Sequence, residues 1–449
     1  MAVLISIFCL FVAFLCKRKY YLWINPGSVF FITWGIIFLL YSFKLFGIYE
    51  VGINTFFMYL VGLLAFSIAF LQYDKYNYQH GVEIRKRGQL LFYDKSSAFL
   101  LFNFVLAAMI MGGEAIKRIP YWIAGGASAV KHANIAGLSE EGDLIDIIYS
   151  LYAAPIQIIS VILLAVFVYF PRKRLNYVFF GLGILLMLLR YICTGSKAMI
   201  SFAIIMIIIV YSYHRNVSGQ KTKAIYKFLA VSVAFAILLY LLFSFGEEGS
   251  AAEGLYFYIS GCIPFSEKAL LSIDSDGQFM HGMVSANGIV RAFGYAMKIL
   301  QLPISFADQI DDAYDSMMEF EEADYVSGKF VYNAYVSLFI YFYKDAGILG
   351  VALISYLWGR FCVFCYKSFL RYGDMMTFLL FLFNTFSLVF SMVRFQPFLI
   401  FNTLTYVFII LFYFRNYYRA RFRNRKVVVK FQQIPTWCFL SKMHKVDIK

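Results

Sequence analysis

Charged residues are scarce in this sequence. Only 15% of its 449 residues are Asp, Glu, Lys or Arg, while 61% are hydrophobic. Soluble domains carry about 25% charged residues, so the composition excludes an ordinary soluble domain and indicates a multi-pass membrane protein. Apolar runs of the roughly 20 residues needed to cross a bilayer recur along the chain. We predict an all-α fold with about 11 to 13 transmembrane helices.

Cysteines are also few, and their placement implies no disulfide framework. Cys362 and Cys365 have the spacing of a metal site, but they lie in an apolar stretch without companion ligands, so we expect them to pack. The sequence contains no P-loop and no soluble nucleotide-binding domain. We predict neither a metal nor a cofactor. Residues 1–16 lack the features of a cleaved signal peptide and are expected to form a retained first span.

Basic residues give the chain a net charge of +14, but they occur in short clusters at the ends of apolar runs. Such clusters set the orientation of membrane proteins, because Lys and Arg favour the cytoplasmic side. We therefore predict no nucleic-acid partner. The basic tail 415–449 and the clusters are placed inside; the clusters are 17–19, 75–95, 172–174 and 215–227.

Acidic residues concentrate in one segment, 246–329, which holds 14 of the 26 in the chain against four Lys or Arg, a formal charge of −10. We interpret this segment as a large extracytoplasmic loop. It divides the chain into N-terminal helices (1–245), the loop, C-terminal helices (330–414) and the tail (415–449). Any chemistry is expected beside the loop.

A simple count of spans conflicts with this orientation. Twelve spans that start outside must also end outside, whereas the basic tail favours the inside. Either 330–366 does not form two spans, or a re-entrant element lies near 285–306. The candidate spans are 2–16, 28–47, 52–71, 98–113, 144–170, 176–193, 197–213, 225–245, 330–343, 347–366, 375–393 and 397–414.

One short connection is predicted to bind an anion. Arg190 and Lys197 lie before and after a Gly-Ser turn that contains Ser196, between two spans at the outer face. A cation and free backbone N–H groups at the start of the next helix suit a phosphate. The alternative is that both cations only snorkel to the membrane surface.

Two further arginines stand out on the outer side, where cations are otherwise rare. Arg291 lies in the acidic loop, where it can pair with a carboxylate or grip a pyrophosphate through its planar fork of donors. Arg394 separates two apolar spans and opposes the usual charge bias. His281, the single His of the loop, is a candidate general base or a structural residue.

Carboxylates from 308 to 322 recur at intervals of three and four, which predicts a helix with one acidic face. That face is either simply solvated or contacts a cation or sugar hydroxyls. Further on, Asn333 and Asp345 bracket a run that predicts a capped helix break, in which glycines let two helices approach closely.

The pattern N-x-Y-x-x-L-x-x-x-x-Y-x-D-x-G-x-x-G over 333–350 resembles the oligosaccharide repeat-unit polymerases, the Wzy-type proteins of O-antigen and capsule assembly. The G-S-K turn at 195–197 is similar to the G-S-R found there, with Lys in place of Arg. The opening, with Lys17-Arg18-Lys19, Asn25-Pro26 and Trp34, also resembles that family.

The resemblance implies a GT-C-like membrane glycosyltransferase in the bacterial cytoplasmic (inner) membrane. It would transfer a growing glycan from undecaprenyl pyrophosphate to a new lipid-linked repeat, with a flippase and a chain-length regulator as pathway partners. Arg291, Arg394 and His281 are the expected catalytic residues; Arg190, Ser196, Lys197, Asn333 and Asp345 are expected to bind substrate. An O-antigen ligase-like transferase and a lipid-linked oligosaccharide flippase remain as alternatives.

Overall fold

The structure is a computed structural model that describes residues 1–87, 97–137, 147–169, 175–196, 198–218, 251–300, 307–321, 324–328, 330–332 and 336–414. Helices dominate it. They are α1 (Ala2–Tyr20), α2 (Pro26–Ser42), α3 (Ile53–Leu71), α4 (Tyr78–Arg87), α5 (Ser97–Gly137), α7 (Ala154–Tyr169), α8 (Leu175–Thr194), α9 (Ala198–Ser218), α11 (Ala251–Ser260), α12 (Cys262–Asp276), α13 (Asn287–Ile299), α14 (Ala307–Met318), α15 (Leu338–Tyr372), α16 (Met375–Val389) and a last helix, Ile400–Phe414.

Short elements join some of these helices. A π-helical turn, η3 (Tyr149–Ala153), precedes α7, and three 3₁₀ turns, η1, η5 and η6, cover Leu45–Gly47, Phe390–Met392 and Gln396–Phe398. A further 3₁₀ turn, η4 (Glu319–Glu321), follows α14, and β1 (Asp324–Tyr325) pairs antiparallel with β2 (Val331–Tyr332).

Within the described residues, six helices are long and apolar enough to cross a membrane, and three shorter apolar helices accompany them. The six are Ile53–Leu71, Ala98–Ala127, Tyr149–Phe167, Tyr177–Thr194, Leu338–Tyr372 and Met375–Met392; the shorter ones are Pro26–Ser42, Met199–Arg215 and Ile400–Phe414. The chain is thus an α-helical, multi-pass membrane protein, as the composition predicts. The predicted span 225–245 and the tail 415–449 lie outside the described residues.

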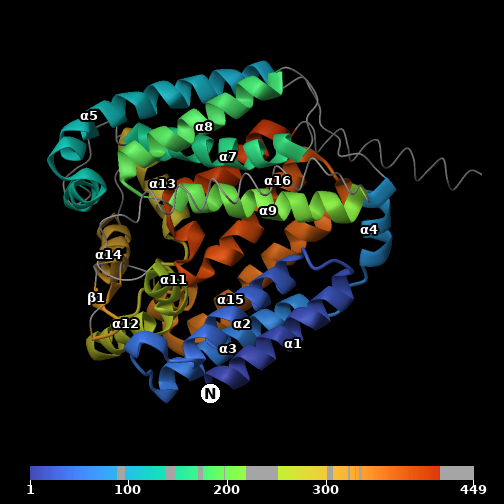
Figure 1. The fold of residues 1–449 in the computed structure, drawn as a ribbon, viewed down its shortest axis with the longest axis vertical. Coiled ribbons are helices and arrows are strands. Elements are labelled where there is room, and N and C mark those ends of the chain that lie inside the picture. Colours follow the sequence, from blue (N-terminus) through green and yellow to red (C-terminus); the bar gives the residue numbers. More distant parts are fainter. Residues whose placement is uncertain are drawn as a thin grey trace, which may run out of the picture.

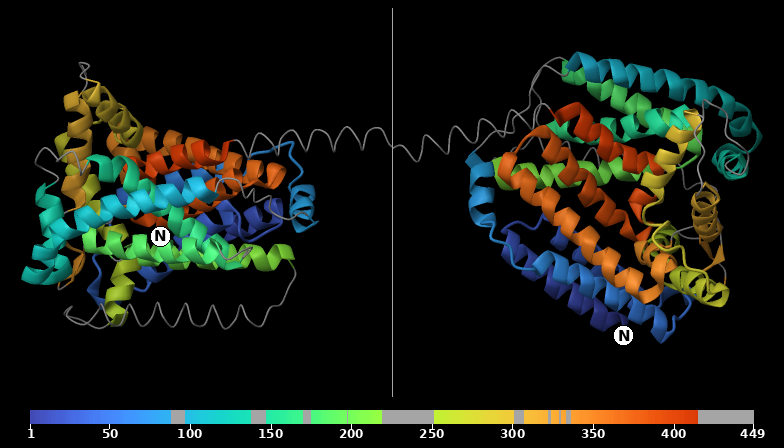
Figure 2. Two further views of the ribbon diagram at one scale, coloured as in Figure 1. Left: turned by 90° about the horizontal axis from the view of Figure 1, so that it is seen from above. Right: turned by 180° about the vertical axis from the view of Figure 1, so that it is seen from behind.

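The two ends of the bundle differ in charge. Helix α4, in the basic segment 75–95, lies at one end and runs across the bundle instead of along it, while α11, α12, α14 and β1 lie toward the opposite end (Figures 1 and 2). The described helices α11, α12 and α14 of the acidic segment and helix α4 therefore lie toward opposite ends of the bundle. Their orientation across the membrane stays a prediction.

Helix α14 has the amphipathic character predicted from its carboxylate spacing. Asp311, Asp312 and Asp315 are exposed, whereas Ala313 and Met317 are fully buried. Among the described residues, no group of three His, Cys, Asp or Glu is arranged to hold a metal ion.

Residues 338–343 of the predicted span 330–343 and the whole predicted span 347–366 belong to one element, α15, which breaks sharply at Ala346 and Gly347. A Cβ built on Gly350 would lie 2.2 Å from the carbonyl oxygen of Phe342. In a continuous helix these residues would be about 12 Å apart along the axis, so the chain folds back at the break. Gly347 has φ 59, a left-handed conformation that favours glycine.

This break corrects the count of spans. The first part of α15 runs only from Leu338 to Asp345, about 12 Å, which is too short to cross a membrane of about 30 Å. It is also buried almost all round, so it packs inside the protein and does not face lipid. The region therefore supplies one span in place of two, as the conflict over the tail anticipated.

Aromatic side chains hold this buried segment against the N-terminal helices. The ring of Phe339 lies 5.2 Å from Trp34 and 5.5 Å from Tyr59, and a Cβ on Gly62 would meet it at 2.2 Å. Gly62 therefore lets α3 and α15 pack closely. Trp34 also donates to Ser391 Oγ at 3.0 Å, which ties α2 to η5.

Candidate functional site

A cavity of about 210 Å³ lies where the turn between α8 and α9 meets the segment that follows α16. Its polar lining includes Arg190, Thr194, Ser196, Arg394 and Gln396. Apolar side chains from α7, α9 and α16 form the rest, and Tyr258 of α11 contributes from the acidic segment. Arg394, which the sequence singled out on its own, is thus brought together with Arg190 and Ser196.

Arg190 is 8% exposed and is held by two aromatic rings. Its guanidinium carbon lies 5.1 Å from the ring of Tyr149 and 5.0 Å from that of Phe401, and its Nη1 donates to the Tyr149 hydroxyl. The planar guanidinium suits such stacking, which Lys cannot reproduce. Of its five N–H donors, this is the one engaged among the described contacts, so others are available to a ligand in the cavity.

The position of Tyr149 depends on the π-helical turn at Tyr149–Ala153. Such turns widen the helix locally and often occur at functional sites. Tyr152, in the same turn, donates to Asn103 Oδ1 of α5 at 2.6 Å, which fixes the turn against its neighbour.

The turn between α8 and α9 begins at a left-handed glycine. Gly195 adopts φ 62 and its N–H donates to Tyr191 O at 2.8 Å, which ends α8. Thr194 Oγ1 accepts from the Ser196 N–H at 3.2 Å. Because Met199 lines the cavity at the start of α9, the N-terminus of that helix faces the cavity and adds its favourable dipole for anions.

The opposite wall is the bend between α16 and the last helix. Asn402 Nδ2 donates to the Gln396 backbone oxygen at 2.9 Å and to Gln396 Oε1 at 3.0 Å, which closes the bend on itself. Arg394, in the same bend, is half-buried. Helix α13 supports the bend from behind, since a Cβ on Gly288 would lie 2.2 Å from Pro397 O.

The lining is positively charged. Among the described residues that line the cavity there are two arginines and neither a carboxylate nor a histidine. The buried Glu114 belongs instead to α5, where its carboxylate pairs with Lys117 at 3.5 Å and Arg118 at 3.0 Å. A cationic cavity between apolar helices favours an anionic ligand, because a charge at membrane depth is costly without a partner of opposite sign.

Comparison with family models, with curated proteins and with solved structures finds no match for this chain. The assignment of a function therefore depends on the geometry of the cavity and on the residues of the sequence.

Other candidate residues lie away from the cavity lining. The guanidinium of Arg291 stacks 3.6 Å from the ring centre of Tyr314. This aromatic contact is neither the carboxylate pair nor the pyrophosphate contact that the sequence suggested for Arg291. His281 is exposed, with φ 49, and its N–H donates to Asp345 O at 2.9 Å. Lys197 and Asn333 lie outside the described residues.

Asp345 holds a neighbouring turn. Its Oδ1 accepts from the N–H groups of Gly282 at 3.0 Å and Val284 at 2.9 Å, and its Oδ2 accepts from the Ser285 N–H at 2.8 Å and from the Ser285 hydroxyl. This carboxylate fastens the chain just before α13 to the break in α15. It therefore positions the helix that supports the Pro397 bend.

Sequence reasoning missed Tyr149, Gln396, Phe401 and Asn402. Tyr149 and Phe401 are ordinary aromatic residues of apolar segments, and nothing in the spacing marks them. A polar pair on either side of Pro397, close to Arg394, was a signal that could have identified Gln396 and Asn402.

Proposed function

We propose that this chain is a membrane glycosyltransferase that polymerises oligosaccharide repeat units linked to undecaprenyl pyrophosphate. It would act at the outer face of the bacterial cytoplasmic membrane, alongside a flippase and a chain-length regulator, and produce O-antigen or capsule. The observation that supports the proposal is the shared cavity of Arg190 and Arg394 (about 210 Å³), which places a second cation beside the turn at 195–197 that is similar to the family's G-S-R.

In this reaction the bond between the anomeric carbon of the growing glycan and the pyrophosphate oxygen breaks. A hydroxyl of the incoming repeat forms the new glycosidic bond and gives its proton to a base, and the lipid pyrophosphate leaves with the bonding electrons. Negative charge grows on the leaving group, so donors that are already in place lower the barrier. We assign that role to Arg190 and Arg394, helped by the N-terminus of α9.

This assignment changes the expected catalytic pair. Arg291 stacks on Tyr314 and does not line the cavity, so Arg190 replaces it as the partner of Arg394. The cavity serves the donor pyrophosphate. The described residues of its lining include no carboxylate or histidine, and the base for the acceptor is not assigned to it.

The test uses purified protein and lipid-linked repeats, with polymer length read on a gel. Arg190→Gln and Arg394→Gln should each reduce the rate by roughly 10²- to 10³-fold, the usual cost of one preorganised donor. Arg190→Lys should also be impaired, because Lys cannot stack between Tyr149 and Phe401. Arg371→Gln, which removes a cation from the last turn of α15, is the matched control and should polymerise normally.

Normal chain lengths in both Gln variants, at equal protein levels, would refute the role of the cavity. Deletion of the gene separates the alternatives. A surface glycan with a single added repeat supports a polymerase, whereas complete loss of lipid-attached polymer indicates a ligase or a flippase.

A further inference from the structure

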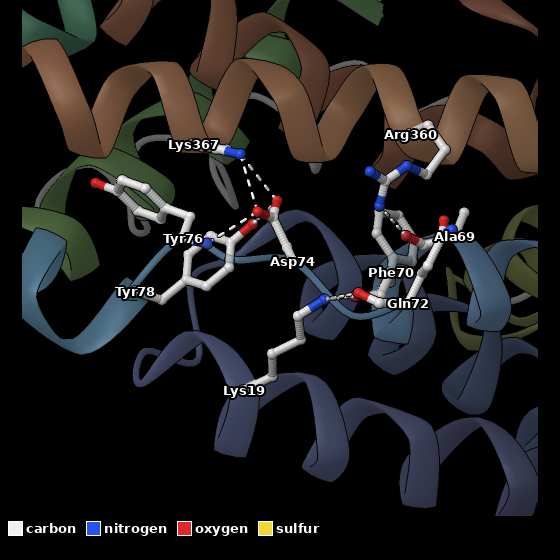
Figure 3. Close-up of polar contacts among 9 residues, drawn as sticks. All are labelled: Lys19, Ala69, Phe70, Gln72, Asp74, Tyr76, Tyr78, Arg360 and Lys367. Carbon is white, nitrogen blue, oxygen red and sulfur yellow. Dashed lines mark hydrogen bonds and ion pairs between the residues drawn. The ribbon is translucent and has the colours of Figure 1, made fainter.

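A second cationic cluster lies at the C-terminal end of α3, where the chain continues toward α4 (Figure 3). Lys19 of α1 donates through Nζ to the backbone oxygens of Phe70 at 2.8 Å and Gln72 at 2.7 Å. Arg360 of α15 donates through Nη1 to Ala69 O at 3.2 Å. The two cations therefore reach the C-terminal end of α3 from opposite sides, where the helix dipole favours positive charge.

Among the described residues of this cluster, one carboxylate balances the cations. Lys367 pairs with Asp74 at 2.9 Å, and Asp74 also accepts from the Tyr76 N–H at 2.9 Å. The three cations and one carboxylate that the structure describes here leave an excess of two positive charges. Burial lowers the pKa of Lys19 to about 8, and Arg360 and Lys367 add to this effect, which Asp74 opposes.

Free donors remain in the cluster. Arg360 has five N–H donors and one bond among the described contacts, and both Arg360 and Lys19 are partly exposed. Gly359 makes this geometry possible, because a Cβ there would lie 2.7 Å from Ala69 Cβ, so α15 approaches α3 closely enough for Arg360 to reach the helix end.

The surroundings of the cluster are those of a lipid headgroup region. Three exposed aromatic residues, Tyr21 (51%), Trp23 (49%) and Tyr73 (83%), lie next to it in the chain, and exposed Trp and Tyr are enriched at membrane surfaces. An apolar stripe runs along α15 from Arg360 toward the other end of the bundle. Its members, Leu349, Leu353 and Leu357, are 76%, 60% and 55% exposed.

We propose that this cluster binds the phosphate of an anionic phospholipid, with Arg360 and Lys19 as its main contacts. A guanidinium binds phosphate through parallel hydrogen bonds, and basic pockets between transmembrane helices bind acidic headgroups. An acyl chain lies along the stripe Leu349–Leu353–Leu357, which a soluble anion would leave uncovered. The lipid fastens α1 and α15 to the end of α3, and the site is independent of the cavity.

The experiment measures retention of phosphatidylglycerol by the purified protein in detergent at about 0.15 M salt, where surface attraction is screened within about 8 Å. Native mass spectrometry counts bound lipid, with phosphatidylcholine as the neutral comparison. Phosphatidylglycerol should bind more tightly. Arg360→Gln should weaken it about tenfold, equivalent to about 1.4 kcal/mol.

Arg18→Gln is the matched control, because it removes an exposed charge from the same turn of α1 as Lys19. It should lower affinity less than about twofold in screened buffer. An equal loss in Arg18→Gln and Arg360→Gln would overturn the site and leave only surface charge. If Arg360→Gln fails to fold, Arg360→Lys decides: weakened binding at normal thermal stability in phosphatidylcholine supports the site, and unchanged binding refutes it.

Two further arms identify the source of the phosphate. Inorganic phosphate and glycerophosphate, added in excess, should not displace the lipid, because neither can use the apolar stripe. Displacement at concentrations similar to that of the lipid would show a soluble-anion site and refute the lipid. Equal retention of phosphatidylglycerol and phosphatidylcholine would also refute it.

Discussion

Asp345→Asn should release the turn that precedes α13. The carboxylate accepts four hydrogen bonds from residues 282–285, two on each oxygen. Asn retains one acceptor oxygen and places an NH₂ group where the other stood, so at least one backbone N–H faces a donor: that of Ser285 in one orientation of the amide, those of Gly282 and Val284 in the other. An unsatisfied buried donor costs about 1–3 kcal/mol, and the bonds that remain lose their charge assistance.

We therefore expect a local cost of about 3 kcal/mol for Asp345→Asn, a more than hundredfold increase in opening of this turn. Hydrogen exchange with mass spectrometry, in micelles, measures it directly: amides 282–285 should lose their protection. Polymerisation should fall as well, because α13 supports the Pro397 bend of the cavity.

The matched control is Asp374→Asn. Asp374 is also buried, but it caps α16 through the Thr377 N–H at 3.2 Å and the Thr377 hydroxyl at 2.8 Å. Loss of a cap costs about 1 kcal/mol, and exchange at 282–285 should not change. If Asp345→Asn leaves exchange at 282–285 within about threefold of the wild type, the carboxylate does not hold this turn and our reasoning is wrong.

Two further predictions concern packing and pH. Gly288→Ala should destabilise the protein by about 1–3 kcal/mol in thermal unfolding, because its Cβ would lie 2.2 Å from the rigid backbone oxygen of Pro397. Gly254→Ala is the control and should not destabilise the protein, because Gly254 has open space around it. Equal melting temperatures of the two variants would contradict the packing of α13. Burial alone would raise the pKa of Asp74, but the hydrogen bond from Lys367 and those from Tyr76 and Tyr78 lower this pKa below the usual 3.8. The ionised Asp74 carboxylate therefore stabilises the fold above about pH 4, and this stabilisation is lost as the pH falls through the lowered pKa. Asp74→Asn should therefore flatten the acid side of the profile of stability against pH, and an unchanged profile would contradict this.

The sequence by itself determined the class of the protein. Its apolar runs specify membrane helices because backbone groups in lipid must be satisfied within the helix. Charge placement predicted opposite sides of the membrane for the acidic segment 246–329 and the basic segment 75–95, and the described helices α11, α12 and α14 lie toward the end of the bundle opposite α4. Local signals also marked the turn at Gly195 and the break before Gly347, since left-handed backbone and close helix approach favour glycine.

The sequence could not decide how α15 is used. An apolar run with a break is compatible with two spans or with a folded-back segment, and the difference depends on partners far away in the chain. Gly62 accepts Phe339, and Asp345 binds the turn at 282–285. Only these tertiary contacts make Leu338–Asp345 a buried segment.

The candidate site shows the same division. Arg190, Ser196 and Arg394 were identifiable because charge and a flexible turn at membrane depth are costly without a purpose. Their meeting in one cavity, and the absence of Arg291 from its lining, required the tertiary structure, since residues some 200 positions apart carry no spacing signal. The stacking of Arg190 between Tyr149 and Phe401 depends on a π-helical turn and on a distant bend, so only the packed bundle decides which arginines face a ligand.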